Sequence, residues 1–351
     1  MISALVTEPG VPHSTRVEQV DEPRGDGVLL RVLEVGVCGT DREISEGLFG
    51  VAPEGADRLV MGHESLAVVA RDGHGFSEGD LVCATVRRPC GHCLACDEGA
   101  PDSCLTGDYS ERGITRLDGF ARELVLEDPE QLVPIPRTLG RLGVLAEPAS
   151  ICARAVRHTL TIGGRQPWSP GRALVTGAGA VGLLSTLLLR LEGLDVCTAS
   201  LEPANEIAAA LGAEYVQIGE GTDLAELGRF DVVVEAAGDA QLMADALGLL
   251  RRSGVACLLG IDGRDGAVEL SRHVIGVDAV LENRVLFGSV NAHRQDWVAA
   301  VDALDRARTG FPDALDRLVA LRVPLDRFEE AFAFTGGKAT LVVDEAAIVL
   351  P

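Results

Sequence analysis

Four of the nine cysteines lie within the short stretch PCGHCLACDEGAPDSC (89–104). They follow the spacing C-x2-C-x2-C-x7-C: Cys90, Cys93, Cys96 and Cys104. Gaps of two residues let a turn aim successive sulfur atoms at one point, and zinc takes four thiolates as a closed tetrahedron. The spacing therefore predicts a structural zinc site. An iron–sulfur cluster is the alternative, although the C-x3-C-P ending of the bacterial ferredoxin run is missing from the sequence.

Three further residues have the types that bind a catalytic metal. Cys38 lies in GVCGTD, His63 in MGHES and Glu147 in LAEPAS. One thiolate, one imidazole and one carboxylate leave a fourth position for water or substrate, which is the arrangement of catalytic zinc. Taken singly, Cys38 or His63 fits an ordinary core position better. The glycines that flank both residues favour the metal site, but only the fold can bring the three together.

A glycine-rich turn in ALVTGAGAVGLLSTLLLRLEG (173–193) follows an expected strand and opens an expected helix. Its glycines fit G-x-G-x-x-G, in which the first makes a tight turn, the second lets pyrophosphate approach the backbone and the third lets helix pack on strand. The helix N-terminus favours phosphate. The motif therefore predicts a dinucleotide site. The predicted cofactor-binding residues are Gly177, Gly179, Ala180, Val181, Gly182, Ser200, Leu201 and Glu202.

The tip of the second strand of such a sheet sets the choice of cofactor. An acid at this tip binds the adenosine ribose hydroxyls, whereas an arginine accommodates a 2′-phosphate. The chain reads Ala199, Ser200, Leu201, Glu202 at this point, with Glu202 a little late for an ideal ribose ligand. Because the tip carries no arginine, the sequence favours NAD over NADP.

A length of 351 residues indicates two domains. The first 150 or so residues have short alternating runs and predict a β-rich, barrel-like domain, and the helix AEPASICARAVRHTL (146–160) leads out of it. The tail from 291, ending in LVVDEAAIVLP, is expected to return to that domain. Between them, buried strands alternate with helices, which predicts an α/β doubly wound sheet. The predicted strands are LDVCTAS (194–200), FDVVVEAAG (230–238), VACLLGI (255–261) and VLFGSV (285–290).

The charge balance and the N-terminus limit the partners and the location. Acidic residues outnumber basic ones by 53 to 31, so we expect no nucleic acid and no membrane as a partner. The first residues, MISALVTEPGVPHSTR, reach acids and prolines too early for a secretory signal. We therefore expect a cytoplasmic protein, in whose reducing surroundings clustered cysteines favour metal over disulfides.

The ordered motifs GVCGTD, GHE, the four-cysteine lobe, an E-P pair and GAGAVG resemble the zinc-containing medium-chain alcohol and polyol dehydrogenases. TVRRP (85–89), ERGITRLDGF (111–120) and GSVNAH (288–293) are most similar to the archaeal-type glucose dehydrogenases. The resemblance implies a GroES-like catalytic domain over 1–155 and 291–351, with a zinc lobe near 88–105. It also implies a Rossmann NAD(P)-binding domain over 156–290, two zinc ions per chain and a homo-oligomer, either dimer or tetramer.

The family resemblance also implies roles for individual residues. Cys38, His63 and Glu147 would hold the catalytic zinc, with Glu64 as a fourth or water-mediated ligand. Thr40 would bind the reacting hydroxyl and relay its proton toward the cofactor ribose. The residues implied to contact a sugar are Thr40, Glu111, Glu147 and Asn291, with His293 nearby.

Three positions depart from the family pattern. Val86 and Ile151 stand where some relatives have polar residues that touch the sugar, and Glu43 replaces a histidine that relays protons elsewhere in the superfamily. The resemblance implies glucose as the substrate, oxidised at C1 to a lactone. Acidic side chains in the site would suit such a neutral polyhydroxyl compound, because carboxylates accept hydrogen bonds from hydroxyl groups.

Two alternatives remain open at this point. The first is a dehydrogenase of another secondary alcohol, such as a cyclitol, a different aldose or a sugar-bearing pathway intermediate. The second, from another class, is a non-catalytic nucleotide-binding or redox-sensing protein. An intact set of metal-binding residue types argues against the second alternative, because a protein that had lost its catalytic activity would not need all of these residues.

Overall fold

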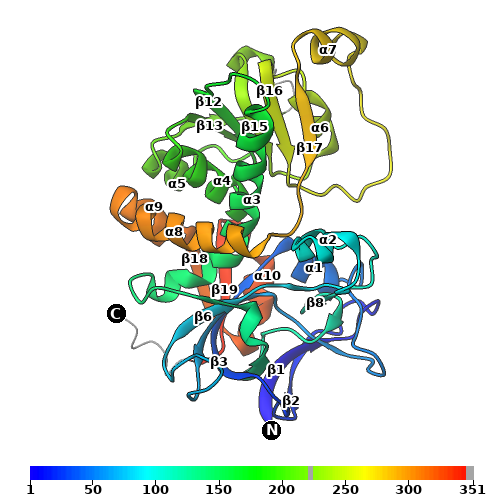
Figure 1. Ribbon diagram of the computed structural model, residues 1–351, viewed down its shortest axis with the longest axis vertical. Helices are drawn as coiled ribbons and strands as arrows, with labels where there is room; N and C mark the ends of the chain where they lie inside the picture. The colour runs from blue at the N-terminus through cyan, green and yellow to red at the C-terminus, as the bar shows by residue number, and fades with distance from the viewer. Residues whose placement is uncertain (220–223, 345–351) are drawn as a thin grey trace. The chain divides into compact units, whose positions relative to one another are not determined.

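The structure is a computed structural model that describes residues 1–219 and 224–344 (Figure 1). The chain forms two compact units. Unit 1 comprises Met1–Ser150, Asn291–Asp305 and the chain from Val319 on, and unit 2 comprises Ile151–Val290 and Arg306–Leu318. Helix α3 (Ala146–Gly163) contains the first boundary between the units.

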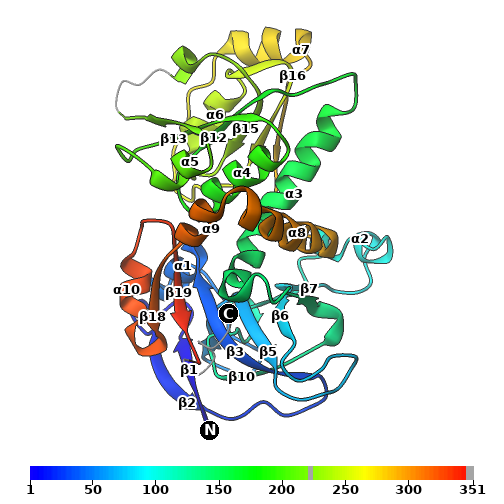
Figure 2. The same ribbon diagram turned by 90° about the vertical axis from the view of Figure 1, so that its left-hand side faces the viewer.

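Unit 1 is built on a seven-stranded sheet. Its strands are β3 (Val28–Val37), β5 (Glu64–Val69), β6 (Leu81–Ala84), β10 (Leu124–Glu127), β11 (Leu132–Pro134), β18 (Val319–Pro324) and β19 (Lys338–Val342). The order is β11-β6-β5-β3-β19-β18, and β10 also pairs with β3. Figure 2 shows β19, from the end of the chain, beside β3. The tail therefore returns to this unit, although residues 345–351 lie outside the described part.

Strand β3 positions the chemistry of unit 1. Its sequence VLLRVLEVGV is mostly apolar, and most of its side chains on both faces are buried. Gly36 lies opposite Glu64 of β5, and Val37 lies opposite Ala339 of β19. The end of β3 therefore meets the beginnings of β5 and β19.

Two small sheets and several short helices complete unit 1. One sheet has the order β2-β1-β4 and the other β7-β8-β9. These strands are β1 (Ile2–Thr7), β2 (Arg16–Val20), β4 (Leu59–Val60), β7 (Arg87–Arg88), β8 (Ser110–Arg112) and β9 (Arg116–Leu117). The helices are α1 (Gly39–Ser45), α2 (Leu94–Asp97) and α10 (Phe328–Ala333), and α8 (Arg294–Gly310) begins in this unit.

Unit 2 is a six-stranded parallel sheet. Its strands are β12 (Arg172–Thr176), β13 (Asp195–Ser200), β14 (Glu214–Gln217), β15 (Phe230–Glu235), β16 (Leu250–Leu258) and β17 (Val285–Gly288). The order β14-β13-β12-β15-β16-β17 is that of a doubly wound nucleotide-binding fold. Its helices are α4 (Ala180–Leu191), α5 (Glu206–Ala210), α6 (Ala240–Ala246), α7 (Ala279–Leu281) and α9 (Pro312–Leu318). Figure 1 shows this sheet, and the predicted α/β class is confirmed.

The structure differs from the expected organisation in two segments, both of which the sequence placed with the first domain. Residues 151–155 belong to unit 2 because the boundary falls at Ser150, within α3, and residues 306–318 also belong to unit 2. For the second segment the reason is local packing: α9 contacts α5, and Arg317 of α9 forms an ion pair with Glu206 of α5. Within residues 1–219 and 224–344, no helix combines the length and apolar character needed to cross a bilayer.

Candidate active site and zinc-binding clusters

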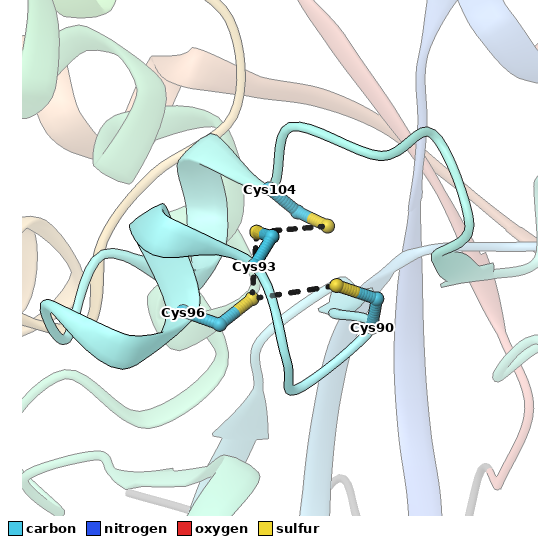
Figure 3. Close-up of side chains that lie close together, drawn as sticks. All are labelled: Cys90, Cys93, Cys96 and Cys104. Atoms are coloured by element: carbon cyan, nitrogen blue, oxygen red, sulfur yellow. Dashed lines mark hydrogen bonds between the residues drawn. The ribbon is translucent and has the colours of Figure 1, made fainter.

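The four clustered cysteines converge on one point (Figure 3). The Sγ atoms of Cys93 and Cys96 lie 3.4 Å apart, those of Cys90 and Cys96 3.9 Å, and those of Cys93 and Cys104 4.0 Å. A zinc–sulfur bond of about 2.3 Å gives a tetrahedron with edges of about 3.8 Å. All four cysteines are free thiols. The geometry therefore fits the structural zinc site that the sequence predicts.

Short turns aim these sulfur atoms. Gly91 and Gly99 adopt left-handed backbone conformations, with φ of 77° and 76°, which glycine enters without strain. Backbone hydrogen bonds at Cys90 and hydrogen bonds at Thr106 lower the pKa of Cys104 to about 6. The backbone N–H of Leu105 donates to Cys93 Sγ at 3.4 Å and lowers the pKa of that thiol. Both thiols are thus prepared to ionise, which zinc binding requires.

The second cluster gathers Cys38, His63 and Glu64, whose ligand atoms all lie within 4.8 Å of one another. Cys38 follows β3 and caps α1, His63 directly precedes β5, and Glu64 begins β5. His63 and Glu64 are 4% and 1% exposed, so water does not screen their interaction with a metal. The fold thus brings together residues from separate sequence motifs, and their nitrogen, sulfur and oxygen donors suit zinc.

Asp41, to which the sequence analysis gave no role, organises this cluster. One carboxylate oxygen accepts the backbone N–H of Cys38 at 2.8 Å, and the other lies 3.4 Å from His63 Nδ1. Burial alone would lower the pKa of His63, but the negative charge of Asp41 raises it well above its ordinary value. Asp41 therefore holds the imidazole ring as outer carboxylates do in metal sites. Its place three residues after Cys38 in GVCGTD was the available signal.

Lys338 is a second residue that sequence reasoning missed. Its Nζ donates to both carboxylate oxygens of Glu64 at 2.6 Å and to the carbonyl oxygen of Val37 at 3.0 Å. Burial works against the ammonium form, but the charges of Glu64 and Cys38 raise the pKa of Lys338. The Glu64 side chain therefore has a buried cationic partner of its own.

Glu147 and Thr40 lie near this cluster. Glu147 is buried in the first turn of α3, and burial together with the charge of Glu64 raises its pKa to about 7. It is not part of the group whose ligand atoms approach within 4.8 Å. Thr40 Oγ1 lies 3.9 Å from Cys38 Sγ, so its hydroxyl borders the site.

The residues expected to contact a sugar have different surroundings. Glu111 accepts hydrogen bonds from Arg87 at 2.9–3.0 Å. Asn291 Oδ1 accepts the N–H of Ala292 at 2.8 Å, while its buried Nδ2 has no hydrogen-bond partner in the described part of the chain. His293 uses both ring nitrogens within the protein, one on Gly99 and one on Gln295. Asn291 thus offers a free donor, whereas His293 links its loop to the zinc lobe.

A cavity of about 570 Å³ also lies in unit 1. Its lining residues include Arg87, Asp102, Glu130, His293 and Arg294. The volume is within the range of small-molecule sites. The lining contains none of the candidate zinc ligands, so the cavity alone does not define where a sugar would bind.

The glycine turn of unit 2 has the geometry of a phosphate cradle. Gly177 has a φ of 94°, and a β-carbon there would lie 2.9 Å from the backbone of Ala236. A β-carbon on Gly182 would lie 2.0 Å from the carbonyl oxygen of Gly177, so only glycine allows α4 to pack this closely. Gly179 begins α4 with open space where its β-carbon would be. A ligand can therefore approach the backbone at Gly179.

At the tip of β13, polar contacts fix the residues that the sequence predicts to bind the adenosine half of a cofactor. Ser200 Oγ accepts the N–H of Ala178 at 3.2 Å and donates to the Glu202 carboxylate. The Tyr215 hydroxyl donates to the backbone of Glu202 at 2.7 Å. Leu201 is 72% exposed. The tip thus presents an anchored carboxylate, with no cation in the segment 199–202.

Two protein families match the chain. The alcohol dehydrogenase GroES-like domain matches residues 24–137, and the glucose dehydrogenase C-terminus matches residues 140–344. The chain is 41% identical over 343 residues to a glucose 1-dehydrogenase of Methanocella arvoryzae, covering 94% of this chain and 95% of the relative. A glucose 1-dehydrogenase of Thermoproteus tenax is 41% identical over 346 residues, covering 95% of this chain and 96% of the relative.

The fold is also similar to a solved structure, Haloferax mediterranei glucose dehydrogenase in complex with NADP, zinc and gluconolactone. The TM-score is 0.89 at 32% identity, over 97% of this chain and 99% of that chain. A GroES-like unit followed by a doubly wound nucleotide-binding unit is the architecture of the zinc-dependent medium-chain dehydrogenases, which oxidise CH–OH groups with NAD(P). Within that class, the chain belongs to the glucose dehydrogenase family.

Proposed function

We propose that the protein oxidises an aldose of the glucose type at C1 to the lactone, with NAD as the hydride acceptor. The observation that carries the proposal is the buried cluster of Cys38, His63 and Glu64 in a chain whose relatives are glucose 1-dehydrogenases. The Haloferax mediterranei relative holds NADP, zinc and gluconolactone together, and gluconolactone is the product of such a reaction.

The two clusters support two zinc sites per chain, one at Cys38, His63 and Glu64 and one at the four clustered cysteines. Cys38, His63 and Glu147 would hold the catalytic ion, with Glu64 beside it, and the four cysteines would hold a structural ion. The catalytic ion would supply Lewis acidity, which lowers the pKa of a sugar hydroxyl. Cysteine, histidine and carboxylate donors match what zinc requires for this chemistry.

The side chains of the protein orient the sugar and move a proton. Thr40 accepts the proton of the C1 hydroxyl and passes it toward the cofactor ribose. A bound oxidised nicotinamide would accept the hydrogen of the C1–H bond together with its electron pair, which would leave C1 and its oxygen as a carbonyl. Glu111 and Glu147 accept hydrogen bonds from sugar hydroxyls, and Asn291 donates through its free Nδ2.

The preference for NAD is supported by the tip of β13. The anchored Glu202 carboxylate suits two ribose hydroxyls, whereas a 2′-phosphate would meet negative charge and find no arginine in the segment 199–202. The Haloferax mediterranei relative contains NADP. A preference for NAD in this chain would therefore distinguish it from that relative.

We also propose a homo-oligomer in the cytoplasm, without nucleic acid or membrane as a partner. The net charge of −22 repels both polyanions. Nine free cysteines support a reducing compartment. Strand β17 has a single strand neighbour within the described residues, and exposed apolar side chains surround it, among them Leu281, Leu286 and Val290. An unprotected edge of this kind favours self-association.

The first experiment is to mix the zinc-loaded protein with D-glucose and either NAD or NADP, at low and at high salt, and to follow reduced nicotinamide by absorbance. We expect turnover with glucose and a higher kcat/KM with NAD. Turnover with NADP alone would contradict the cofactor preference. Failure with glucose in all four conditions, together with turnover of a cyclitol or another aldose, would contradict the substrate while leaving the reaction class in place.

A further inference from the structure

We propose that Lys338 is a positioning residue that holds the Glu64 carboxylate away from the catalytic metal and so decides which carboxylate completes the zinc site. The inference rests on the proposed zinc site and deepens it. Glu64 is close enough to Cys38 and His63 to bind the same ion, yet its two oxygens are both engaged by Lys338. The Glu64 carboxylate can therefore bind either the Lys338 ammonium group or a zinc ion.

The contacts of Lys338 use its donors fully. Its Nζ lies 2.6 Å from each Glu64 oxygen and 3.0 Å from the carbonyl oxygen of Val37, and these three contacts match the three donors of an ammonium group. Lys338 is 3% exposed and Glu64 is 1% exposed. A buried pair of this kind holds its geometry, because losing either partner leaves an uncompensated charge in the protein.

The backbone reserves the space that Glu64 occupies in this arrangement. A β-carbon on Gly36, which lies opposite Glu64 in the sheet, would be 1.9 Å from the Glu64 Oε2 atom. Glycine at this position therefore lets the carboxylate fold back over β3 toward Lys338. Among the described ion pairs Glu147 has none of this kind, although the charges of His63 and Lys338 act on its carboxylate, and it therefore remains available to the metal.

The amino-acid composition also distinguishes Lys338 from the other basic residues. The chain contains 31 basic residues, and Lys338 is the single lysine among them. Arginine is planar and bulky and donates from a fixed fork, whereas an ammonium group is compact and directs three donors around one atom. The three contacts with Glu64 and Val37 converge on one nitrogen atom, which suits the compact donor.

The proposal predicts that removing Lys338 strengthens zinc binding. In Lys338→Met, Glu64 loses its partner, and zinc becomes the remaining cation that can compensate its buried charge. We expect the dissociation constant for zinc at the site of Cys38 and His63 to fall by about tenfold or more. Outer-shell partners of metal ligands change metal affinity on this scale. A merely structural lysine would instead weaken zinc binding through local disorder when replaced.

A double-mutant cycle shows whether Lys338 acts through Glu64. Zinc affinity is measured by competition with a chelator for the wild type, Lys338→Met, Glu64→Gln and the double variant. We expect Lys338→Met to have no effect on affinity in the Glu64→Gln background. An equal gain in both backgrounds would mean that Lys338 acts on the metal by direct repulsion, and weaker binding in folded Lys338→Met would also overturn the proposal.

The single lysine supplies a readout that does not depend on the Lys338→Met variant. Protein labelled with [15N]lysine gives one side-chain ammonium signal, because no other lysine exists in the chain. We expect the chemical shift of this signal in the wild type to change little when zinc binds. It should also differ from the chemical shift of the same signal in Glu64→Gln. A zinc-loaded signal that matches Glu64→Gln would show that Glu64 leaves Lys338 for the metal, which would overturn the proposal.

These measurements are independent of the substrate. Zinc affinity and the ammonium signal are recorded without sugar or nicotinamide. Coupling between Lys338 and Glu64 in a protein that fails to oxidise glucose would support the role of Lys338 while contradicting the proposed substrate. Turnover of glucose without that coupling would support the proposed function and overturn the role of Lys338.

Discussion

The Asp41 carboxylate links Cys38 and His63, two residues of the candidate metal site. It accepts the backbone N–H of Cys38 and lies against the imidazole of His63, and it is 2% exposed. A buried carboxylate beside a metal-binding histidine fixes the orientation of the ring and raises its basicity. The position of His63 is therefore set by charge as well as by packing.

We predict that Asp41→Asn weakens zinc binding. Asparagine keeps an oxygen for the N–H of Cys38 but loses the negative charge that faces His63. We expect zinc affinity at this site to fall by about 10- to 100-fold, with a parallel loss of turnover at limiting zinc. Affinity is measured by chelator competition. The matched control is Asp57→Asn, whose side chain is 88% exposed, and equal affinities for the two variants would contradict the role of Asp41.

At the scale of the element, the cysteine lobe and the β3–β5 junction are separate structures, each with the residue types of its own metal site. The sulfur atoms of the lobe, in the segment 89–104, approach one another through local turns. The second cluster depends on strand pairing, because Gly36 and Glu64 are opposite residues in the sheet. Loss of one metal should therefore leave the other in place.

We predict reciprocal zinc losses in two serine variants. Cys90→Ser removes one of four thiolates, so the lobe loses its zinc and the segment 89–104 becomes sensitive to protease. Cys38→Ser loses the other ion and its turnover but keeps its fold. Zinc analysis should give about two ions per chain in the wild type and about one in each variant. Loss of both ions in either single variant would contradict the independence of the two clusters.

The elements differ in how well they could be predicted from the sequence. The cysteine spacing and the GAGAVG turn were readable because their geometry is local: each ligand or glycine acts on residues a few positions away. Strand β14 was not predicted, since EYVQ is short and partly exposed at a sheet edge. The strand expected over 255–261 instead spans Leu250–Leu258 as β16, because its pairing with β15 begins at Leu250.

The partners of the catalytic cluster could not be read in this way. Asp41 was within reach, because it is three residues from Cys38. Lys338 is 274 residues from Glu64 and meets it through the pairing of β19 with β3. The residue type of Lys338 does not mark it as part of a metal site. Such long-range pairs follow from strand register, which the alternating pattern of single strands does not specify.

For the whole molecule, the edge of the parallel sheet in unit 2 determines the expected assembly. Strand β17 pairs with β16 on one side, and within residues 1–219 and 224–344 no strand pairs with its other side. Leu286 of β17 is 40% exposed, and Val290, two residues beyond it, is 64% exposed. Exposure of these apolar side chains to water is unfavourable. A second copy of the same edge would cover them symmetrically.

We predict that Leu286→Asp combined with Val290→Asp reduces the mass of the particle. The two carboxylates would place like charges face to face across a two-fold axis and would have to be buried there, which disfavours the assembly. Sedimentation velocity should show an oligomer for the wild type and a monomer, or a smaller oligomer, for the variant. The control is Val11→Asp, at an exposed apolar residue of unit 1. An unchanged mass in the double variant would exclude the β17 edge as the interface, and a monomeric wild type would contradict the oligomer itself.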